Sequence, residues 1–417
     1  MNSILQGTRG ARLLLLLAVA ALECSLAMVS AADDPAAAAR ASLERIQAVR
    51  KERPGDGLLV FYQALTHVGL GERQPAFELL RSLKGRKLGM IPLRDIGFGP
   101  IWEDAEFQKI RKELVDDEPK TPDASVAFRL KDAKLIPEGI AYDPKGKRFF
   151  VGSIAQRKII VSDGKGDARD FSSPSDKLDT VLGLAVDSQR KHLYAVSTNG
   201  FLDEAKRERR NAVFRYELKS GRLAERITAA DAMQLNDLVI TPDGTLYVTD
   251  SIGGTLFRKR TADATLTPLG PPGRLRGVNG IALSADGAVY VAASTGIVRV
   301  NTESGEPTRL PQPDDVVTGG CDGLTWYEDD LLGVQNSTNP GRVIRIALVD
   351  GGNRIAGVTV LQSHHHPEFD VPTTGAVAEG AFHVIARSHV QRYQPDGTID
   401  QVDALKPTAI LAIPLTR

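Results

Sequence analysis

Residues 278–294 read VNGIALSADGAVYVAAS, and this stretch decides the fold. Two alternating runs flank a turn formed by residues 284–287, which contains the pair Asp-Gly. Alternation is typical of half-buried β-strands, and a turn of this kind between two such runs predicts a β-hairpin. Asn279 and Gly280 stand at the start of the first strand.

The same unit occurs six times after residue 125. The copies read EGIAYDPKGKRFFVGS, LGLAVDSQRKHLYAVS, NDLVITPDGTLYVTDS, NGIALSADGAVYVAAS, DGLTWYEDDLLGVQNS and TGAVAEGAFHVIARS. Equivalent positions in the six copies are Gly139, Gly183, Asp237, Gly280, Gly323 and Gly375. Successive positions are 44, 54, 43, 43 and 52 residues apart, which is the size of a four-stranded propeller blade. The sequence therefore predicts a mainly β fold, a six-bladed β-propeller over residues 125–417, whereas a β-sandwich would show no such long repeat.

The charge balance of the chain argues against nucleic acid as its main partner. Of 417 residues, 52 are Lys or Arg and 52 are Asp or Glu, so the formal net charge is zero. Binding to phosphate backbones requires a basic excess. Apolar residues make up 42% and charged residues 25%, which is ordinary for globular proteins and excludes wholesale disorder.

The N-terminus has the pattern of a cleavable signal peptide. Arg9 and Arg12 precede ten apolar residues, 13–22, and small residues follow at 29–32. Ten apolar residues are too few to cross the ~30 Å hydrocarbon core of a bilayer as a helix. We therefore expect residues 1–31 to be removed and the mature protein to be secreted or periplasmic, with no membrane span.

Residues 35–115 have helical periodicity. Apolar residues three or four positions apart recur in four short segments that end at glycines or begin at a proline. This α-helical domain resembles a degenerate tetratricopeptide-type unit, and a small helical cap without repeat ancestry is the alternative. It carries no visible chemistry, so we expect a packing or docking module through which a protein partner could bind. Residues 116–124, DDEPKTPDA, are expected to be a linker.

The start of each first strand supplies the candidate site. In a propeller these strands line the central channel, so equivalent positions converge at one mouth. The six positions are occupied by Glu138, Leu182, Asn236, Asn279, Asp322 and Thr374. Two carboxylates and two amides, without Cys or His, suit a hard divalent cation, in first place Ca²⁺, with Zn²⁺, Mn²⁺ or Mg²⁺ as alternatives. A local Asx-turn would explain any one Asn or Asp by itself, but not all of them in register.

Four motifs carry a resemblance to a known family. They are PEG at 137–139, LNDL at 235–238, VNGIALSADG at 278–287 and CDGLTW at 321–326. In this order they resemble the family of senescence marker protein-30, gluconolactonase and luciferin-regenerating enzyme over most of residues 126–417. The resemblance implies a six-bladed propeller with one divalent metal ion at the channel mouth, held by Glu138, Asn279 and Asp322. It also implies that Asn236 helps to hold substrate and water.

The chain departs from that family at four places, among them EGI at 138–140 in place of EGP and the opening HHHPEFDVPTTG of blade six at 364–375. Gln234 stands where lactonases of the family often carry a basic residue, and the charged insertion FLDEAKRERRN, residues 201–211, lengthens blade two. These departures put a sugar lactone in question. We expect an exported metal-dependent hydrolase of a small-molecule lactone or related ester, in which the metal polarises the carbonyl and activates water. Asp322 would accept a proton and Asn236 would orient the substrate.

A non-catalytic exported propeller that binds a ligand or protein partner is the alternative function. The helical domain and Gln234 favour that alternative, whereas the four oxygen-bearing side chains favour hydrolysis. Cys321 is expected to be structural because no aligned histidine would activate it. The run His364–His366 is expected in a solvated loop, because three adjacent histidines on an extended strand cannot all face one ion.

Overall fold

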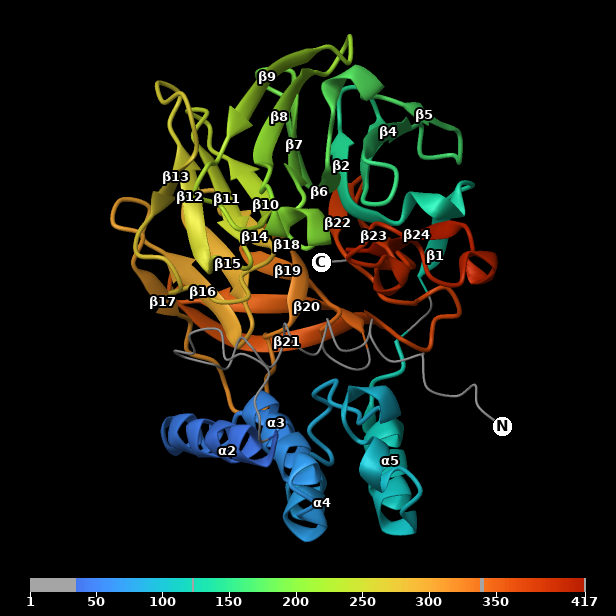
Figure 1. The fold of residues 1–417 in the computed structure, drawn as a ribbon, viewed down its shortest axis with the longest axis vertical. Coiled ribbons are helices and arrows are strands. Elements are labelled where there is room, and N and C mark those ends of the chain that lie inside the picture. The colour runs from blue at the N-terminus through green and yellow to red at the C-terminus, as the bar shows by residue number, and fades with distance from the viewer. Residues whose placement is uncertain (1–34, 122–123, 338–340, 416–417) are drawn as a thin grey trace.

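Six four-stranded antiparallel sheets form a six-bladed β-propeller, with a small helical region at one side (Figure 1). The computed structural model describes residues 35–121, 124–337 and 341–415. The predicted fold class, a mainly β propeller preceded by helices, is therefore confirmed. The predicted signal peptide lies outside the described residues and stays a prediction.

Each blade is a meander that runs outward from the axis. Blade one consists of β2 (Pro137–Asp143), β3 (Arg148–Ser153), β4 (Lys158–Ser162) and β5 (Ala168–Asp170). Blade two consists of β6 (Thr180–Asp187), β7 (His192–Thr198), β8 (Asn211–Glu217) and β9 (Leu223–Thr228). Blade three consists of β10 (Leu235–Ile240), β11 (Leu246–Asp250), β12 (Thr255–Lys259) and β13 (Thr267–Leu269).

The remaining blades follow the same order, except for the last. Blade four consists of β14 (Ile281–Leu283), β15 (Val289–Ala293), β16 (Gly296–Val300) and β17 (Pro307–Arg309). Blade five consists of β18 (Cys321–Tyr327), β19 (Asp330–Gln335), β20 (Arg342–Val349) and β21 (Arg354–Ser363). Blade six consists of β22 (Gly375–Ala378), β23 (Ala381–Ile385), β24 (Thr408–Pro414) and β1 (Ser125–Leu130).

Blade six closes the ring because its outermost strand comes from the start of the propeller. β1 pairs with β24 in antiparallel register, with Leu130 opposite Thr408. The two ends of the propeller sequence are thereby joined in one sheet, which leaves no gap between the first and last blades. Each innermost strand also contacts the innermost strand of both neighbouring blades, so the six form a closed ring around the axis.

Alternation in the sequence places large apolar side chains between the blades. Between blades one and two, for example, Phe150, Val181 and Phe214 belong to one cluster of buried side chains. None of these three side chains is more than 1% exposed. Burial of this kind between neighbouring blades accounts for the apolar positions of the alternating runs.

Four α-helices precede the propeller in the described residues. They are α2 (Pro35–Glu52), α3 (Gly57–Gly69), α4 (Arg73–Arg81) and α5 (Ala105–Asp117). Asp56 accepts hydrogen bonds from the first backbone N–H groups of α3, and Asp104 does the same for α5, so each satisfies donors that the helix leaves free. In the described part of the chain, no helix is both long and apolar enough to cross a membrane.

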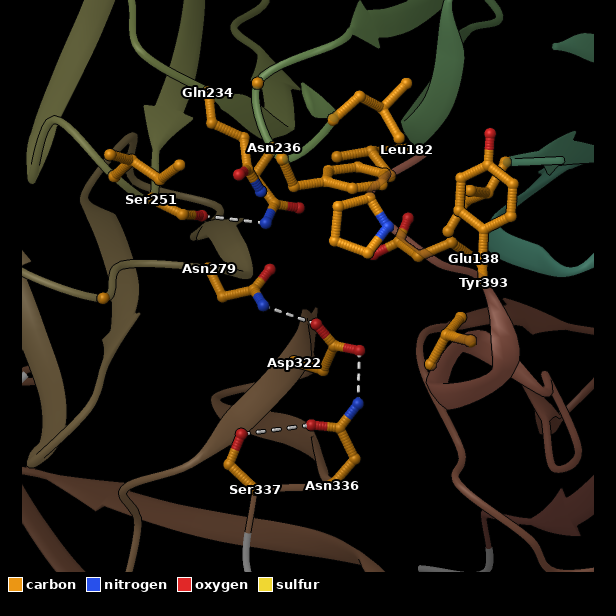
Figure 2. Close-up of a pocket in the computed structure, with 18 of the residues that line it drawn as sticks. Glu138, Leu182, Gln234, Asn236, Ser251, Asn279, Asp322, Asn336, Ser337 and Tyr393 are labelled. Atoms are coloured by element: carbon orange, nitrogen blue, oxygen red, sulfur yellow. Dashed lines mark hydrogen bonds between the residues drawn. The ribbon is translucent and has the colours of Figure 1, made fainter. Parts of the chain in front are cut away.

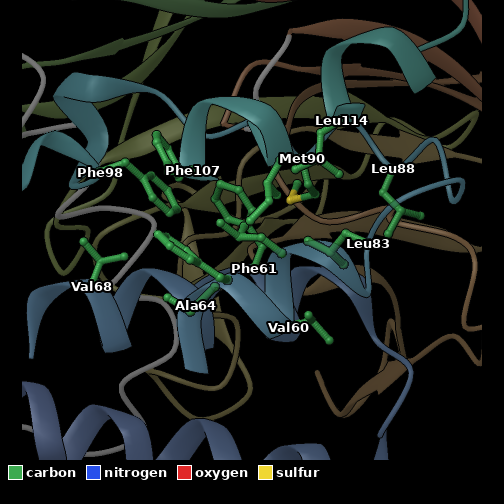
Figure 3. Close-up of a cluster of buried hydrophobic side chains, with 14 of the residues drawn as sticks. Val60, Phe61, Ala64, Val68, Leu83, Leu88, Met90, Phe98, Phe107 and Leu114 are labelled. Atoms are coloured by element: carbon green, nitrogen blue, oxygen red, sulfur yellow. The ribbon is translucent and has the colours of Figure 1, made fainter. Parts of the chain in front are cut away.

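The helices share one apolar core, and this core reaches the propeller. Phe61, Phe98 and Phe107 lie at its centre (Figure 3). Val317, in the loop before β18, belongs to the same cluster of buried side chains. The helical region is therefore packed against blade five rather than joined to the propeller by a linker alone.

Arg342 at the start of β20 anchors the helical region by hydrogen bonds. Arg342 is 2% exposed, and its guanidinium donates to the side chain of Gln335 at 2.6 Å and to the carbonyl of Lys87 at 3.2 Å. Burial raises the pKa of Glu118 and lowers that of Arg342, and the opposite charge of each offsets part of the shift. One buried side chain thus connects β19, β20 and the segment between α4 and α5.

The sequence predicted that all three consecutive histidines lie in a solvated loop, but His366 does not. His364 is exposed, but His366 is buried and donates from Nε2 to the carbonyl of Ala124 at 2.9 Å. His365 accepts a hydrogen bond from the backbone N–H of Thr121 at 3.1 Å. The histidines therefore hold the segment that leads from α5 into β1.

Candidate functional site

Irregular pairing at the start of the innermost strands directs the candidate side chains. Glu138, Asn236 and Asp322 each lie within a register shift between the first and second strands of their blades. A bulge of this kind bends the strand and changes the direction of one side chain, and bulges are frequent beside functional sites. Asn279 lies just before β14, at the equivalent position of blade four.

The glycine that follows three of these residues is required by close approach between blades. A Cβ on Gly139 would lie 2.0 Å from the carbonyl oxygen of Leu182, and one on Gly280 would lie 2.5 Å from the backbone nitrogen of Leu324. Neither distance is sterically allowed, so a side chain at either position would force the blades apart. The Glu-Gly, Asn-Gly and Asp-Gly pairs of the repeat thus bring neighbouring blades into backbone contact at the channel mouth.

Glu138, Asn236, Asn279 and Asp322 point towards one another (Figure 2). Asp322 is held at both oxygens, because the Asn279 amide donates to Oδ1 and the Asn336 amide donates to Oδ2, each at 2.5 Å. The amide of Asn236 donates to the Ser251 hydroxyl at 2.8 Å. All three amide nitrogens are therefore directed towards protein partners.

Three side-chain oxygens remain without a hydrogen-bond partner. They are Oε2 of Glu138, Oδ1 of Asn236 and Oδ1 of Asn279, and each is buried. An unsatisfied buried acceptor costs about 1–3 kcal/mol. Three such acceptors in one place indicate that they bind a partner from outside the chain. Carboxylate and amide oxygens are ligands that Ca²⁺ accepts. The donor set therefore fits a hard divalent cation.

The site concentrates negative charge in a buried place. Burial raises the pKa of Glu138 well above its usual range, and the charges of Asp322 and Asp237 raise it further. Burial also raises the pKa of Asp322 to about 7, although the Asn336 and Asn279 amides act in the opposite direction. The pKa of Asp237 is likewise about 7 because of burial. A divalent cation would relieve this repulsion.

Amide oxygens are essential to any cation site here. Within residues 35–121, 124–337 and 341–415, no three or more His, Cys, Asp and Glu side chains are grouped so that they could hold a metal ion. The candidate cation ligands comprise two carboxylates, of Glu138 and Asp322. The amide oxygens of Asn236 and Asn279 supply the others. This composition suits an oxygen-seeking cation better than one that prefers nitrogen or sulfur.

The structure brings the four predicted residues together, and of the other two aligned positions only Leu182 shares their cavity. Leu182 lines the same cavity as an apolar wall, whereas Thr374 does not line it. The Thr374 hydroxyl instead donates to the backbone carbonyl of Glu138 at 2.6 Å. Thr374 of blade six therefore supports the position of Glu138, and its side chain adds no cation ligand to the site.

Three further site residues escaped the sequence prediction. Asn336 and Ser251 orient Asp322 and Asn236 as described above, and Asp237 adds a third buried carboxyl group. The repeat contained a signal for Ser251 alone, because each quoted unit ends in serine near the end of its second strand. These strand ends lie beside the starts of the first strands, at the same mouth.

Cys321 has the properties of a structural residue. Its thiol is 4% exposed and donates to the carbonyl of Thr318 at 3.5 Å. Burial raises the pKa of this thiol to about 12, so the thiolate form is scarce at neutral pH. This agrees with the expectation that Cys321 is not a nucleophile.

A cavity of about 810 Å³ lies over the four side chains. A volume of this size accommodates a small organic ligand. Its floor contains Glu138, Asn236, Asn279 and Asp322, and Gln234 also lines it. Part of the wall comes from α3, from the loop between β7 and β8, and from the segment between β23 and β24.

Comparison with known proteins leaves the family of this chain open. No protein-family model matches the sequence, and no curated protein matches it either. Among solved structures, a gluconolactonase from Xanthomonas campestris is 15% identical with a TM-score of 0.47, over 71% of this chain and 96% of that chain. Virginiamycin B lyase from Staphylococcus aureus is 19% identical with a TM-score of 0.45, over 62% and 80%.

A third similar structure is the aldose sugar dehydrogenase from Streptomyces coelicolor in its PQQ-bound form. It is 16% identical with a TM-score of 0.47, over 70% of this chain and 98% of that chain. These three proteins carry out different reactions. Similarity at this level does not choose among them, so function has to be argued from the site.

Proposed function

We propose that this chain is an exported, divalent-metal-dependent hydrolase of a lactone or related ester. The convergence of three buried, unpartnered oxygens with the Asp322 carboxylate at the floor of the cavity carries the proposal. The resemblance of four sequence motifs, which contain the same four side chains, to the gluconolactonase family is a second support. Ca²⁺ is the cation that this oxygen set favours.

Glu138, Asn279 and Asp322 would hold the cation, and Asn236 offers a fourth oxygen. When bound, a divalent cation supplies polarisation of the scissile carbonyl, stabilisation of the oxyanion and a lowered pKa of water. Of the Asn236 amide, only Oδ1 faces the cavity without a partner, since its nitrogen donates to Ser251. Asn236 would therefore accept a hydrogen bond from the attacking water or contribute to cation binding, and would orient the reacting groups in either case.

Asp322 is the proposed proton acceptor. Two amide donors fix its carboxylate at the floor of the cavity, where it can accept a proton from the attacking water. The water oxygen bonds to the carbonyl carbon while its proton passes to Asp322. The ring C–O bond then breaks, and the proton is given to the leaving alkoxide oxygen.

Lactone and ester panels assayed after metal depletion and after addition of Ca²⁺, Mn²⁺ or Zn²⁺ test the proposal. Turnover should disappear on depletion and return with a cation. Glu138→Gln and Asp322→Asn should each lower kcat/KM by about 10²–10⁴-fold. Glu303→Gln is a matched control, because Glu303 is 83% exposed, lies between the two outer strands β16 and β17, and does not line the cavity. Full turnover by the metal-depleted protein would overturn the proposal.

A non-catalytic binding propeller remains the second candidate, favoured by the contact between the helical region and the cavity. It predicts that ligands bind without turnover under every metal condition. Retained folding and cation binding, together with no hydrolysis across the panels, would support it against the hydrolase.

A further inference from the structure

Helix α3 contributes two side chains, Leu58 and Tyr62, to the cavity over the candidate site. They are four positions apart and therefore lie on the same face of the helix. No blade of the propeller supplies this part of the wall. The helical region, in which the sequence showed no chemistry, is thus part of the cavity.

The position of α3 relative to the site is fixed by direct contacts. The Leu58 side chain packs so closely on Gly319 that a Cβ there would lie 2.8 Å from Leu58 Cδ2. Gly319 is three residues before Asp322. At the start of the helix, Asp56 caps α3 and forms an ion pair with Arg309 of the propeller at 3.5 Å. The wall and the floor of the cavity therefore belong to one packed unit.

The inner wall of the cavity is mainly apolar, although Gln234, Gln391 and Gln394 also line it. Leu58 and Tyr62 face the same space as Leu182, Phe201, Ile252 and Tyr393. Ile252 is 39% exposed, one of only two large apolar side chains exposed to this degree in the described residues. The charged residues that line the cavity, apart from the floor, are exposed on loops: Asp203, Lys206, Arg209 and Asp396. A cavity with a mainly apolar wall and a few convergent polar groups at its floor is typical of a site for a small organic ligand.

This distribution distinguishes between classes of substrate. The hydroxyl groups of a polyol placed against these apolar side chains would lose water without gaining partners, which is unfavourable. An alkyl or aryl group placed there would gain from burial. The carbonyl at the other end of such a molecule would lie over the oxygen-lined floor.

We infer that α3 forms a specificity wall, and that the cavity accepts a lactone or ester carrying an alkyl or aryl group rather than a polyhydroxylated one. The inference rests on the proposed function for the reaction, but the wall itself would bind apolar groups whether or not hydrolysis follows. Leu58 and Tyr62 are the residues that determine the preference.

A series of γ-lactones with unbranched alkyl substituents of increasing length, compared with glucono-1,5-lactone, tests the substrate class. kcat/KM should rise by about three- to fourfold for each methylene that the wall buries, until the cavity is full. Glucono-1,5-lactone should be the poorest substrate. Equal kcat/KM along the series, or a preference for glucono-1,5-lactone, would overturn the inference while leaving the hydrolase intact.

Variants of α3 test the wall. Leu58→Ala and Tyr62→Ala should each lower the ratio of kcat/KM between the longest and shortest γ-lactone by about tenfold. Leu65→Ala is the matched control, because Leu65 lies on the same helix, packs on the same cluster and does not line the cavity. Tyr62 is only partly buried, so its variant keeps the test open if Leu58→Ala fails to fold. An unchanged ratio in a folded Tyr62→Ala protein would overturn the wall.

A binding measurement separates failure of the wall from failure of the hydrolase. Calorimetric titration with γ-lactams that carry the same alkyl groups reports binding without hydrolysis. Affinity that rises with chain length and falls in Tyr62→Ala, without turnover of any lactone, would support the wall and refute the hydrolase. Affinity independent of chain length would refute the wall.

Discussion

The amide of Asn279 donates a hydrogen bond to Oδ1 of Asp322 at 2.5 Å, although the two residues are 43 positions apart in the sequence. That separation is one blade repeat, so the bond joins equivalent positions of neighbouring blades. It directs Oδ1 of Asn279 away from Asp322, where this oxygen has no partner. The geometry of the pair therefore depends on how closely blades four and five approach each other.

Gly280→Ala should disrupt this pair. A Cβ on Gly280 would lie 2.6 Å from the carbonyl oxygen of Asp322, and backbone atoms would have to move to relieve the clash. We expect a loss of stability of about 1–3 kcal/mol, as for overpacking of a tight interior, together with weaker cation binding. Chemical denaturation and calcium titration measure the two effects.

Gly357→Ala is the control for this change. Gly357 lies in β21, and a Cβ there would meet no atom within 4 Å. That variant should keep both stability and calcium affinity. Unchanged calcium affinity in a destabilised Gly280→Ala protein would show that the approach of the two blades does not set the site.

Removal of divalent cations should lower the melting temperature. Asp237 and Asp322 are buried close enough to Glu138 that their charges raise its pKa. The carboxylates of the cation-free site therefore repel one another. Saturation at 100 times the Kd would add about 2.7 kcal/mol of stability. For a domain of this size that amounts to roughly 3–5 °C, measurable by scanning calorimetry with chelator or calcium.

Glu138→Gln gives the matching control for the cation effect. The substitution removes one charge from the repulsive set and one cation ligand. The melting temperature without cation should therefore rise, and the increase caused by calcium should be lost. A melting temperature of the unsubstituted protein that responds to none of Ca²⁺, Mn²⁺ and Zn²⁺ would contradict the proposed site.

The periodic part of the architecture could be predicted from the sequence, because the same physics repeats in every blade. Glu138, Asn236, Asn279 and Asp322 were recognised by their common register, and the ring of innermost strands brings them together. The helices followed from apolar spacing and from the glycines and the proline at the ends of the segments. These signals are local or periodic, so a single sequence is enough to detect them.

Contacts between unlike elements could not be predicted in this way. Asn336 orients Asp322 from the neighbouring strand, and neither periodicity nor a motif marks the pairing. The packing of Leu58 on Gly319 joins segments about 260 residues apart, one in a helix and one in a loop. Such contacts depend on the shapes of both surfaces, which the pattern of either segment does not contain.

Arg342→Met should destabilise the protein by about 3–5 kcal/mol, because it leaves the buried charge of Glu118 and the acceptors at Gln335 and Lys87 without their partner. Denaturant midpoints of the full chain measure the loss. Arg345→Met on the same strand is the control, since the Arg345 side chain is 24% exposed. It should cost less than about 1 kcal/mol. Equal effects of the two variants would show that the buried guanidinium is not the anchor.

The ion pairs of Glu368 should make the closure of the ring sensitive to acid. Burial alone would raise the pKa of Glu368, but hydrogen bonds and charges from Arg129 and Arg387 outweigh burial and lower it. Arg129 lies in β1, and its bond to Glu368 at 2.9 Å links the closing strand to the segment before β22. A lowered pKa means that the folded state favours the carboxylate. The stabilisation is therefore complete at neutral pH and is lost as the pH falls from near 4.5 through the lowered value.

Glu368→Gln tests this dependence on pH. At pH 7 the variant should be less stable than the unsubstituted protein by about 1–3 kcal/mol, the usual contribution of hydrogen bonds to a charged group. The difference should shrink below about pH 4.5, because the native carboxyl group then becomes protonated and loses its advantage over the amide. Urea midpoints between pH 3 and pH 7 measure the difference, with Glu303→Gln as the exposed control. A difference that stays constant over this range would show that the charge of Glu368 does not stabilise the closure.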